Sequence, residues 1–179
     1  MMKFKTKNID GLDIFYREGG SSEKPNFLLL HGFPTSSSMF RHLAPMLESN
    51  FHVIAPDYIG FGNSAAPNHT EFDYTFENLT KYVIKLIDEL ELDKFYMYVF
   101  DYGAPIGFNI AVKYPERILG IISQNGNVYK EGLGKKWAGR ENYWQHPTPE
   151  LRKKYMNAFT PETIKGQYLR GGTTKHSRS

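Results

Sequence analysis

In Met97-Tyr98-Val99-Phe100-Asp101-Tyr102-Gly103-Ala104-Pro105-Ile106-Gly107, a β-forming run passes directly into a helix-forming run, with one acidic residue between them. Aromatic and β-branched residues predict a strand that ends at Phe100. The following residues predict a helix from Tyr102 to Lys113, which Pro115 ends. A carboxylate at such a junction lies at the positive end of the helix dipole and faces unpaired backbone N–H groups. Asp101 is therefore the first residue to which the sequence draws attention.

Two interpretations of Asp101 follow from this segment alone. Asp is a favoured N-cap, so the residue could simply cap the helix. The second interpretation rests on His31-Gly32-Phe33-Pro34, which directly follows an apolar strand ending at Leu30. In a doubly wound sheet, ligands bind beyond the carboxyl ends of the strands, where both segments are expected. The backbone N–H groups of Phe33 and Tyr102 would converge there as an oxyanion hole.

The rest of the chain alternates between strand and helix patterns. The predicted strands are Phe4 to Ile9, Asp13 to Arg17, Asn26 to Leu30, Phe51 to Ala55, Phe95 to Phe100 and Ile118 to Ser123. The predicted helices are Ser37 to Leu47, Thr75 to Glu91 and Tyr102 to Lys113, with two shorter ones near Pro149 and Pro161. Asp10-Gly11 predicts a hairpin turn between the first two strands, and Thr75 is placed to cap its helix. This order predicts an α/β fold with a mostly parallel sheet flanked by helices.

These motifs carry a resemblance to the α/β-hydrolase family, in the branch of epoxide hydrolases and haloalkane dehalogenases. The matching segments are His31-Gly32-Phe33-Pro34, Pro56-Asp57-Tyr58-Ile59-Gly60-Phe61-Gly62-Asn63-Ser64, Asp101-Tyr102-Gly103-Ala104-Pro105-Ile106-Gly107 and Tyr114-Pro115-Glu116-Arg117-Ile118. Together they cover residues 3–127. The Gly-x-Ser-x-Gly elbow of esterases reads Val99-Phe100-Asp101-Tyr102-Gly103 here, so an aspartate stands in place of the serine.

The resemblance implies a mechanism for Asp101. Its carboxylate would attack an sp³ carbon of a small epoxide or haloalkane and form a covalent alkyl ester. Water activated by a histidine would then attack the ester, and the N–H groups of Phe33 and Tyr102 would hold the oxyanion. The resemblance also implies substrate contacts in the loop and in a helical cap. The expected contact residues are His31, Gly32, Pro34, Tyr143 and Trp144.

Two departures from the family pattern bear on the substrate. In the dehalogenases that the chain resembles, a Trp follows the nucleophile and an Asn often occupies the position of Phe33. Here these positions hold Tyr102 and Phe33. Phe33 is the form typical of epoxide hydrolases, in which cap tyrosines donate to the epoxide oxygen. Tyr143, Tyr155 and Tyr168 are candidates for that role. The departures favour epoxide hydrolysis over dehalogenation.

The family's base and its acid are not found among these residues. We expect an α/β-hydrolase fold cut short after about six strands: residues 1–127 form the core, 128–169 start a helical cap, and 170–179 form a polar, disordered tail. A chain without the base should not turn over by itself. The alternative is a catalytically inactive hydrolase-fold fragment that acts by binding or is a remnant. A serine esterase is disfavoured, since Ser64 lies in a loop with no helix after it.

Composition limits the remaining possibilities. The net charge is +3 and the basic residues form no stripe, which argues against a nucleic-acid partner. There is no cysteine, no signal peptide and no apolar run of membrane-spanning length, so we expect a cytoplasmic protein without a membrane partner. No metal and no cofactor is expected. The strand Ile118 to Ser123 would be an exposed apolar sheet edge, through which copies of the chain could associate.

Overall fold

The computed structural model describes residues 1–134, 137–156 and 160–169 of the chain. The chain divides into two compact units, Met1–Val128 and Tyr129–Ser179. Each unit is described by itself below. The first contains the sheet, and the second contains short helices.

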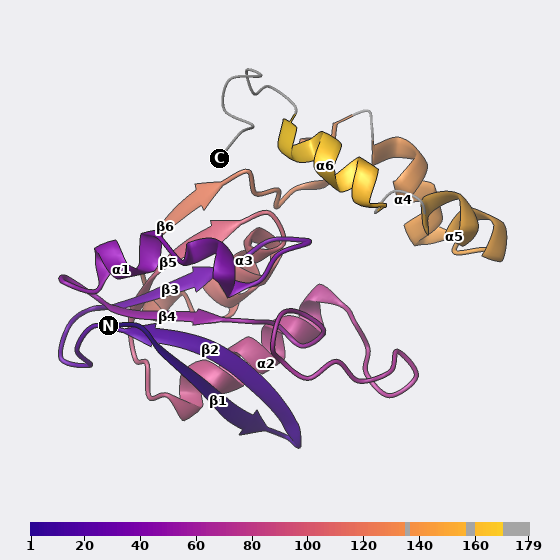
Figure 1. Ribbon diagram of the computed structural model, residues 1–179. Helices are drawn as coiled ribbons and strands as arrows, with labels where there is room; N and C mark the ends of the chain where they lie inside the picture. Colours follow the sequence, from indigo (N-terminus) through magenta and orange to yellow (C-terminus); the bar gives the residue numbers. More distant parts are fainter. Residues whose placement is uncertain (135–136, 157–159, 170–179) are drawn as a thin grey trace. The chain divides into compact units, whose positions relative to one another are not determined.

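The described part of the first unit forms a six-stranded, mostly parallel sheet (Figure 1). Its strands are β1 (Lys3–Ile9), β2 (Leu12–Gly19), β3 (Asn26–Leu30), β4 (His52–Pro56), β5 (Phe95–Phe100) and β6 (Ile118–Gln124). Their order across the sheet is β1-β2-β4-β3-β5-β6. The β1–β2 and β2–β4 pairs are antiparallel, while β3 pairs in parallel with β4 and β5, and β5 with β6. The predicted strands are thereby confirmed, and so is the hairpin turn, where Asp10 and Gly11 have φ values of 51° and 85°.

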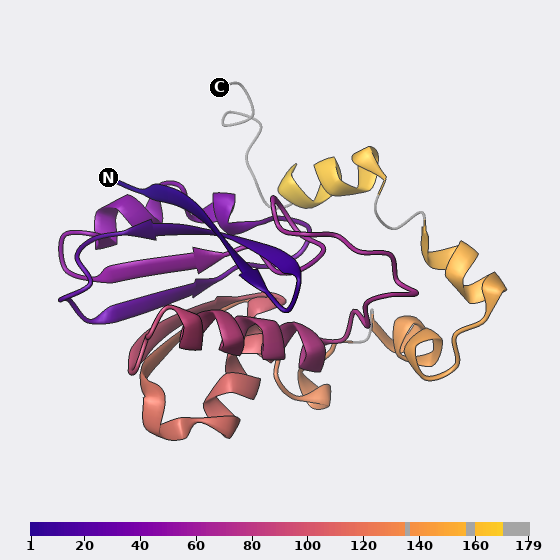
Figure 2. The same ribbon diagram turned by 90° about the horizontal axis from the view of Figure 1, so that it is seen from below.

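Helices cover both faces of the sheet (Figure 2). The helical elements of this unit are η1 (Ser37–Phe40), α1 (Leu43–Leu47), α2 (Phe76–Glu89), α3 (Gly103–Lys113) and η2 (Pro115–Arg117). Residues of α2 and α3 pack with one face of the strands in the larger apolar cluster, and residues of η1 and α1 pack with the other face in a smaller cluster. The central strands β3 and β4 are therefore almost fully buried, as expected for a sheet covered on both sides.

The prediction of one continuous helix from Ser37 to Leu47 was wrong. The segment forms the 3-10 turn η1 and then the separate short helix α1. Pro45 explains the break, because proline lacks an N–H and collides with the carbonyl four residues earlier inside a helix. A helix that begins at Leu43 places Pro45 in the first turn, where no such bond exists.

The strand β6 lies at one edge of the described sheet, paired with β5. The side chains of Leu119 and Ile122 are 45% and 55% exposed. Within the described residues, the exposed apolar edge expected at Ile118 to Ser123 is therefore present.

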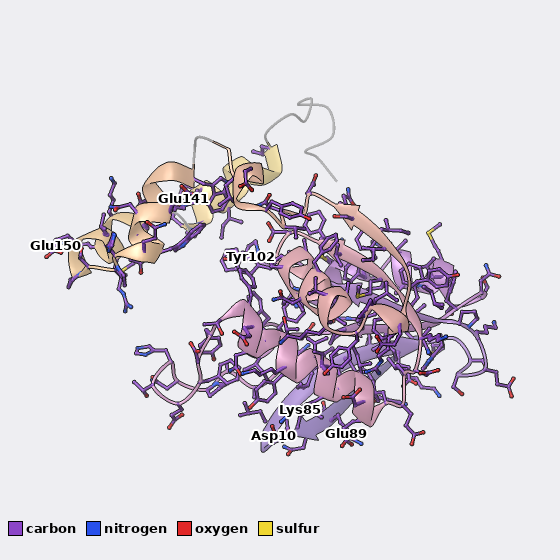
Figure 3. The ribbon with its side chains drawn as sticks, turned by 180° about the vertical axis from the view of Figure 1, so that it is seen from behind. Asp10, Lys85, Glu89, Tyr102, Glu141 and Glu150 are labelled. Carbon is purple, nitrogen blue, oxygen red and sulfur yellow. The ribbon has the colours of Figure 1, made fainter. Side chains whose placement is uncertain are left out.

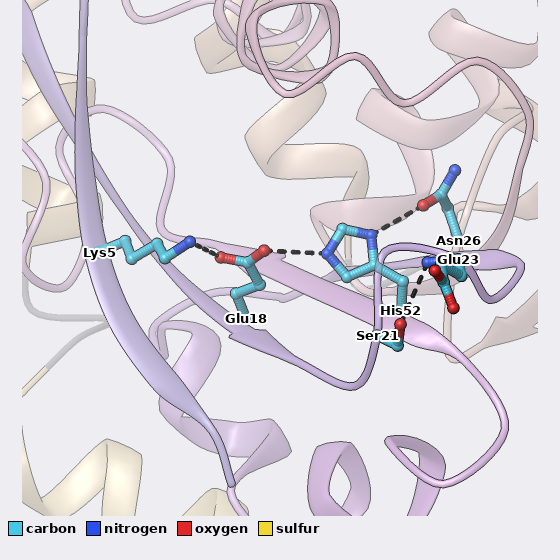
Figure 4. Close-up of polar contacts among 6 residues, drawn as sticks. All are labelled: Lys5, Glu18, Ser21, Glu23, Asn26 and His52. Atoms are coloured by element: carbon cyan, nitrogen blue, oxygen red, sulfur yellow. Dashed lines mark hydrogen bonds and ion pairs between the residues drawn. The ribbon is translucent and has the colours of Figure 1, made fainter.

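A hydrogen-bonded chain of side chains joins β1, β2, β3 and β4 at the end of the sheet where β3 and β4 begin (Figure 4). Lys5 pairs with Glu18, whose carboxylate lies 3.0 Å from His52 Nε2, and His52 Nδ1 lies 2.9 Å from the side-chain oxygen of Asn26. Burial opposes ionisation of Glu18, but the hydrogen bonds from Lys5 and His52 outweigh it, so the pKa of Glu18 is lowered. This chain links the antiparallel hairpin to the parallel strands.

Ion pairs attach the same hairpin to helix α2. Lys85 pairs with Asp10 in the turn, and Lys7 Nζ lies 3.0 Å from Glu89 Oε2. Figure 3 shows Asp10, Lys85 and Glu89 close together at this surface. These pairs are exposed, so each contributes little to stability.

The second unit contains η3 (Lys130–Gly132), α4 (Ala138–Gln145), α5 (Pro149–Met156) and α6 (Pro161–Leu169). The helices predicted near Pro149 and Pro161 are confirmed. Helix α4 was missed because its sequence, Ala-Gly-Arg-Glu-Asn-Tyr-Trp-Gln, has no run of apolar residues at helical spacing. The predicted disordered tail, 170–179, lies outside the described residues. Among the described helices, none is long and apolar enough to cross a membrane.

Candidate active site

Asp101 lies at a sharp bend between β5 and α3. Its backbone has a φ of +50°, a left-handed conformation that is uncommon for a residue with a side chain. The helix begins at Gly103, and its N-cap residue is Tyr102, which makes no side-chain capping bond. The interpretation of Asp101 as a simple cap is therefore not what the structure shows. Asp101 instead points its carboxylate toward the loop that follows β3.

The bend and the loop are in direct contact. The backbone N–H of Phe33 donates to Asp101 Oδ1 at 2.9 Å. This approach requires glycine at position 32, because a Cβ there would lie 2.5 Å from Asp101 Cβ. Gly103 likewise packs against the carbonyl of Leu30, so α3 can begin directly beside the end of β3. The ends of β3 and β5 thus bring together two segments that lie 68 residues apart.

Aromatic rings surround this contact. The ring of Tyr102 lies 5.3 Å from that of Phe33, 4.9 Å from that of Phe76 and 6.4 Å from that of Phe61, measured between centroids. Figure 3 shows Tyr102 at the start of α3. Asp101 and the rings of Phe33, Phe61 and Tyr102 are half-buried. The ring of Phe76 is more exposed, at 37%. The carboxylate is therefore partly accessible and has apolar neighbours, an arrangement suited to a small apolar molecule.

His31 has a different place from the other loop residues. Its side chain is fully buried and stacks on Tyr58, with 4.1 Å between ring centroids. Its Nε2 accepts from the backbone N–H of Tyr58 at 3.4 Å, which leaves the proton on Nδ1, 3.0 Å from the Gly32 carbonyl oxygen. Burial lowers the pKa of His31, although the nearby carboxylates of Asp57 and Asp101 partly oppose this. Both ring nitrogens are thus engaged with the backbone.

A buried carboxylate, Asp57, was not singled out by the sequence. It follows β4 and is fully buried, and it accepts hydrogen bonds from the backbone N–H groups of Ser37 at 2.7 Å and Asn63 at 2.8 Å. Ser64 Oγ donates to the Asp57 carbonyl and accepts from Phe15 N–H. Ser64 therefore holds a loop, as the sequence indicated. The available signal for Asp57 was an acidic residue directly after a buried strand, as at Asp101.

The remaining predicted site residues are described within their own units. Pro34 is exposed. Tyr143 and Trp144 belong to α4 of the second unit, where the ring of Tyr143 packs 5.6 Å from that of Tyr155, and Trp144 packs 5.7 Å from Trp137. The side chain of Tyr168 lies outside the described residues. Within the described part of the chain, no group of three or more His, Asp or Glu side chains is placed to hold a metal ion.

Comparison with known proteins identifies close similarities. Residues 25–163 match the alpha/beta hydrolase fold family. An uncharacterised hydrolase of Saccharomyces cerevisiae is 50% identical over 137 residues, which span 76% of this chain and 47% of that protein. A haloalkane dehalogenase of Agrobacterium fabrum is 37% identical over 187 residues, covering 94% of this chain and 59% of that protein.

Solved structures show the same relationship. The crystal structure of the haloalkane dehalogenase DbeA from Bradyrhizobium elkani superimposes with a TM-score of 0.77 at 30% identity. The match covers 93% of this chain and 58% of that one. The chain therefore spans about half the length of the relatives that it matches.

Proposed function

The chain belongs to the alpha/beta hydrolase fold family, and from this premise we propose that Asp101 is a nucleophile that forms a covalent alkyl ester with small epoxides or haloalkanes. The observation that carries the proposal is the contact between the Asp101 carboxylate and the Phe33 N–H at the end of the parallel strands. A nucleophile must be partly accessible and fixed in orientation. The bend after β5 supports both requirements, because it presents a half-buried carboxylate that the Phe33 N–H holds in place.

The two carboxylate oxygens would have separate roles. Oδ1 accepts the Phe33 N–H and is held in place. Oδ2 would attack the carbon, forming a C–O bond as the bond to halogen breaks and halide leaves. With an epoxide, a ring C–O bond breaks instead, and the alkoxide takes a proton from water. Oδ1 would then be the ester carbonyl oxygen. In the tetrahedral intermediate of hydrolysis it would carry negative charge, which hydrogen bonds from the N–H groups of Phe33 and Tyr102 would stabilise.

Hydrolysis of the ester needs a base that activates water. Among the described histidines, His31 lies nearest in sequence to the loop donor, but both of its ring nitrogens are bonded to backbone groups. His52 is bonded to Glu18 and Asn26 where β4 begins, whereas Asp101 follows the end of β5. We assign the base role to neither. The 179-residue chain is therefore proposed to form the ester and to stop there.

Two substrate classes, epoxides and haloalkanes, fit the same reaction, which is attack of a carboxylate on an sp³ carbon. Relatives of this chain are haloalkane dehalogenases, whereas Tyr102 and Phe33 replace the Trp and Asn that the dehalogenase pattern would place there. The aromatic rings of Phe33, Phe61 and Tyr102 favour an apolar substrate in either case. Styrene oxide and 1-bromobutane represent the two classes.

Intact-mass spectrometry tests the proposal. The purified chain is incubated with styrene oxide or 1-bromobutane, and the modified residue is located by peptide mapping. We expect one adduct on Asp101, its absence in Asp101→Asn, and an undiminished adduct in Asp88→Asn, which alters an exposed carboxylate paired with Arg117. Absence of an adduct from wild-type protein with either compound would leave the alternative, a hydrolase-fold chain that acts only by binding.

Copies of the chain are further proposed to associate through β6. This edge strand has no charged residue between Ile118 and Gln124. The opposite edge, β1, carries Lys3, Lys5 and Lys7, which discourage edge-to-edge pairing. The contrast between the two edges supports β6 as the one that pairs.

A cytoplasmic location is proposed from composition, since a chain without cysteine does not depend on an oxidising compartment. Fluorescence of a tagged chain in cells tests it; accumulation in the secretory pathway would contradict it.

A further inference from the structure

Asp57 is a buried charge that the proposed chemistry does not use. It is fully buried, and among the described residues no Lys or Arg forms an ion pair with it. Burying a carboxylate is costly unless hydrogen bonds replace the lost water. The two backbone N–H groups of Ser37 and Asn63 provide that replacement, one to each carboxylate oxygen. Asp57 therefore joins two loops, because each of its two carboxylate oxygens accepts a hydrogen bond from a different loop.

The next residue, Tyr58, holds the loop from His31 to Ser37 at its other end, which is His31. The Tyr58 hydroxyl donates to the His31 carbonyl at 2.9 Å, and its backbone N–H donates to His31 Nε2 at 3.4 Å. The same hydroxyl has a pKa raised well above its ordinary value, first by burial and then by the negative charges of Asp101 and Asp57. It therefore remains protonated and keeps donating.

Phe33 lies between these two attachment points. Tyr58 fixes the loop at His31, and Asp57 fixes it at Ser37. Between them, Thr35 N–H and Thr35 Oγ1 both donate to the Gly32 carbonyl, at 3.1 and 2.9 Å, which folds the loop into a turn. The direction of the Phe33 N–H is consequently set by groups that do not contact Asp101 themselves.

We propose that Asp57 and Tyr58 are positioning residues, which hold the loop from His31 to Ser37 so that the Phe33 N–H stays aligned with Asp101. The role of this alignment in ester formation rests on the proposed function. The alignment itself is a property of the loop and can be measured without any reaction. The Phe33 N–H fixes the orientation of the attacking carboxylate, and a misplacement of about 1 Å can slow a reaction by about 10²-fold. Partial misalignment should therefore slow ester formation by about tenfold.

Two variants each weaken one of these attachment points. Asp57→Asn preserves the shape of the side chain but places an NH2 group against a backbone N–H. Tyr58→Phe removes only the hydroxyl that donates to the His31 carbonyl and leaves the ring in place.

The first measurement is the rate of adduct formation on Asp101 as a function of styrene oxide concentration. In Asp57→Asn, we expect the maximal rate to fall about tenfold, while the half-saturating concentration changes by less than about twofold. Tyr58→Phe should also react about tenfold more slowly than wild type, and Asp88→Asn should match wild type. Wild-type rates in both Asp57→Asn and Tyr58→Phe would overturn the proposal.

The second measurement is amide hydrogen exchange, which does not depend on reactivity. We expect exchange at Phe33 to rise at least about tenfold in Asp57→Asn, while the buried Val99 amide of β5 keeps its protection. If Val99 also loses protection, the variant has lost its fold, and Tyr58→Phe decides. Unchanged exchange at Phe33 in Tyr58→Phe would overturn the positioning role. If wild type forms no adduct, the proposed function fails, and exchange at Phe33 still tests the alignment.

Discussion

Gly32 and Asp101 approach each other so closely that a Cβ on residue 32 would lie 2.5 Å from the Cβ of Asp101. Real Cβ atoms do not come this near another carbon, so the loop or the bend would have to move. The same approach brings the Phe33 N–H to 2.9 Å from the carboxylate. The side chain of Asp101 therefore requires a residue without a side chain at position 32.

Gly32→Ala tests that pairing. We expect a loss of about 1–3 kcal/mol in the free energy of unfolding, the usual cost of overpacking. Because the carboxylate would be displaced, we also expect at least about a tenfold slower adduct formation on Asp101. Chemical denaturation and intact-mass kinetics measure the two effects. Gly134→Ala serves as the control, because no atom lies within 4 Å of a Cβ at that position. A Gly32→Ala chain with wild-type stability and rate would contradict the close approach.

The left-handed backbone of Asp101 predicts a difference between two substitutions. Asp101→Gly and Asp101→Ala both remove the carboxylate, but only alanine keeps a Cβ at a φ of +50°. We expect the glycine variant to be more stable by about 1–2 kcal/mol, as measured by denaturant unfolding. Equal stability of the two variants would mean that the bend carries no strain.

The burial of His31 predicts a pH dependence of stability. The pKa of His31 in the folded chain lies below its ordinary value of 6.5, so below pH 6.5 the unfolded chain binds more protons. The free energy of unfolding should therefore decrease as pH falls from 6.5 toward the lowered pKa, by up to about 1.4 kcal/mol per pH unit. His31→Gln cannot take up this proton and should show a shallower slope in denaturant titrations between pH 6.5 and 5.5. Parallel slopes would contradict the assignment.

Thr75 caps helix α2, as its sequence position predicted. Its Oγ1 accepts from the Asn78 N–H at 3.2 Å. Thr75→Ala should lower the free energy of unfolding by about 1 kcal/mol, whereas Thr75→Ser keeps the acceptor and should change it by less than half of that. Thermal or urea unfolding of both variants provides the comparison. If the two variants lose the same amount, the capping bond contributes nothing.

The uncharged edge strand predicts self-association. Sedimentation of the wild-type chain should show species larger than the monomer, and Ile122→Lys should shift them toward monomer, because a charge on an edge strand opposes pairing. Val112→Lys is the control: Val112 is 81% exposed but lies on α3, away from the strand backbone. A wild-type chain that sediments as a monomer at high concentration would disprove association through β6.

The fold could be predicted to a large extent because its signals are local. The strand from Phe95 to Phe100 was identified to the residue, since an aromatic and β-branched run is followed at once by an acidic residue and glycine. The helix from Ser37 to Leu47 failed for a reason that is also visible in the sequence, namely Pro45. The exposed edge at β6 was also expected from the sequence, and its side chains Leu119 and Ile122 are 45% and 55% exposed.

The site was predictable in part. Asp101, Gly32 and Phe33 were recognised from two motifs, and the structure brings them into contact. The phenylalanines at 61 and 76 were missed because nothing in their local sequence says that their rings meet Tyr102. Asp57 was missed for the same reason: its partners at Ser37 and Asn63 are defined only by how two loops fold together.

The two apolar clusters differ in size, and the smaller one lies under the segment that continues from the Phe33 loop. Phe40 of η1 packs there with strand residues such as Leu29 and Val53. Elements with little apolar contact open at lower free energy than the rest of a domain. On warming, the donor loop should thus come loose while β3 and β5 still hold together, and reactivity at Asp101 should disappear at a temperature below the melting point of the sheet.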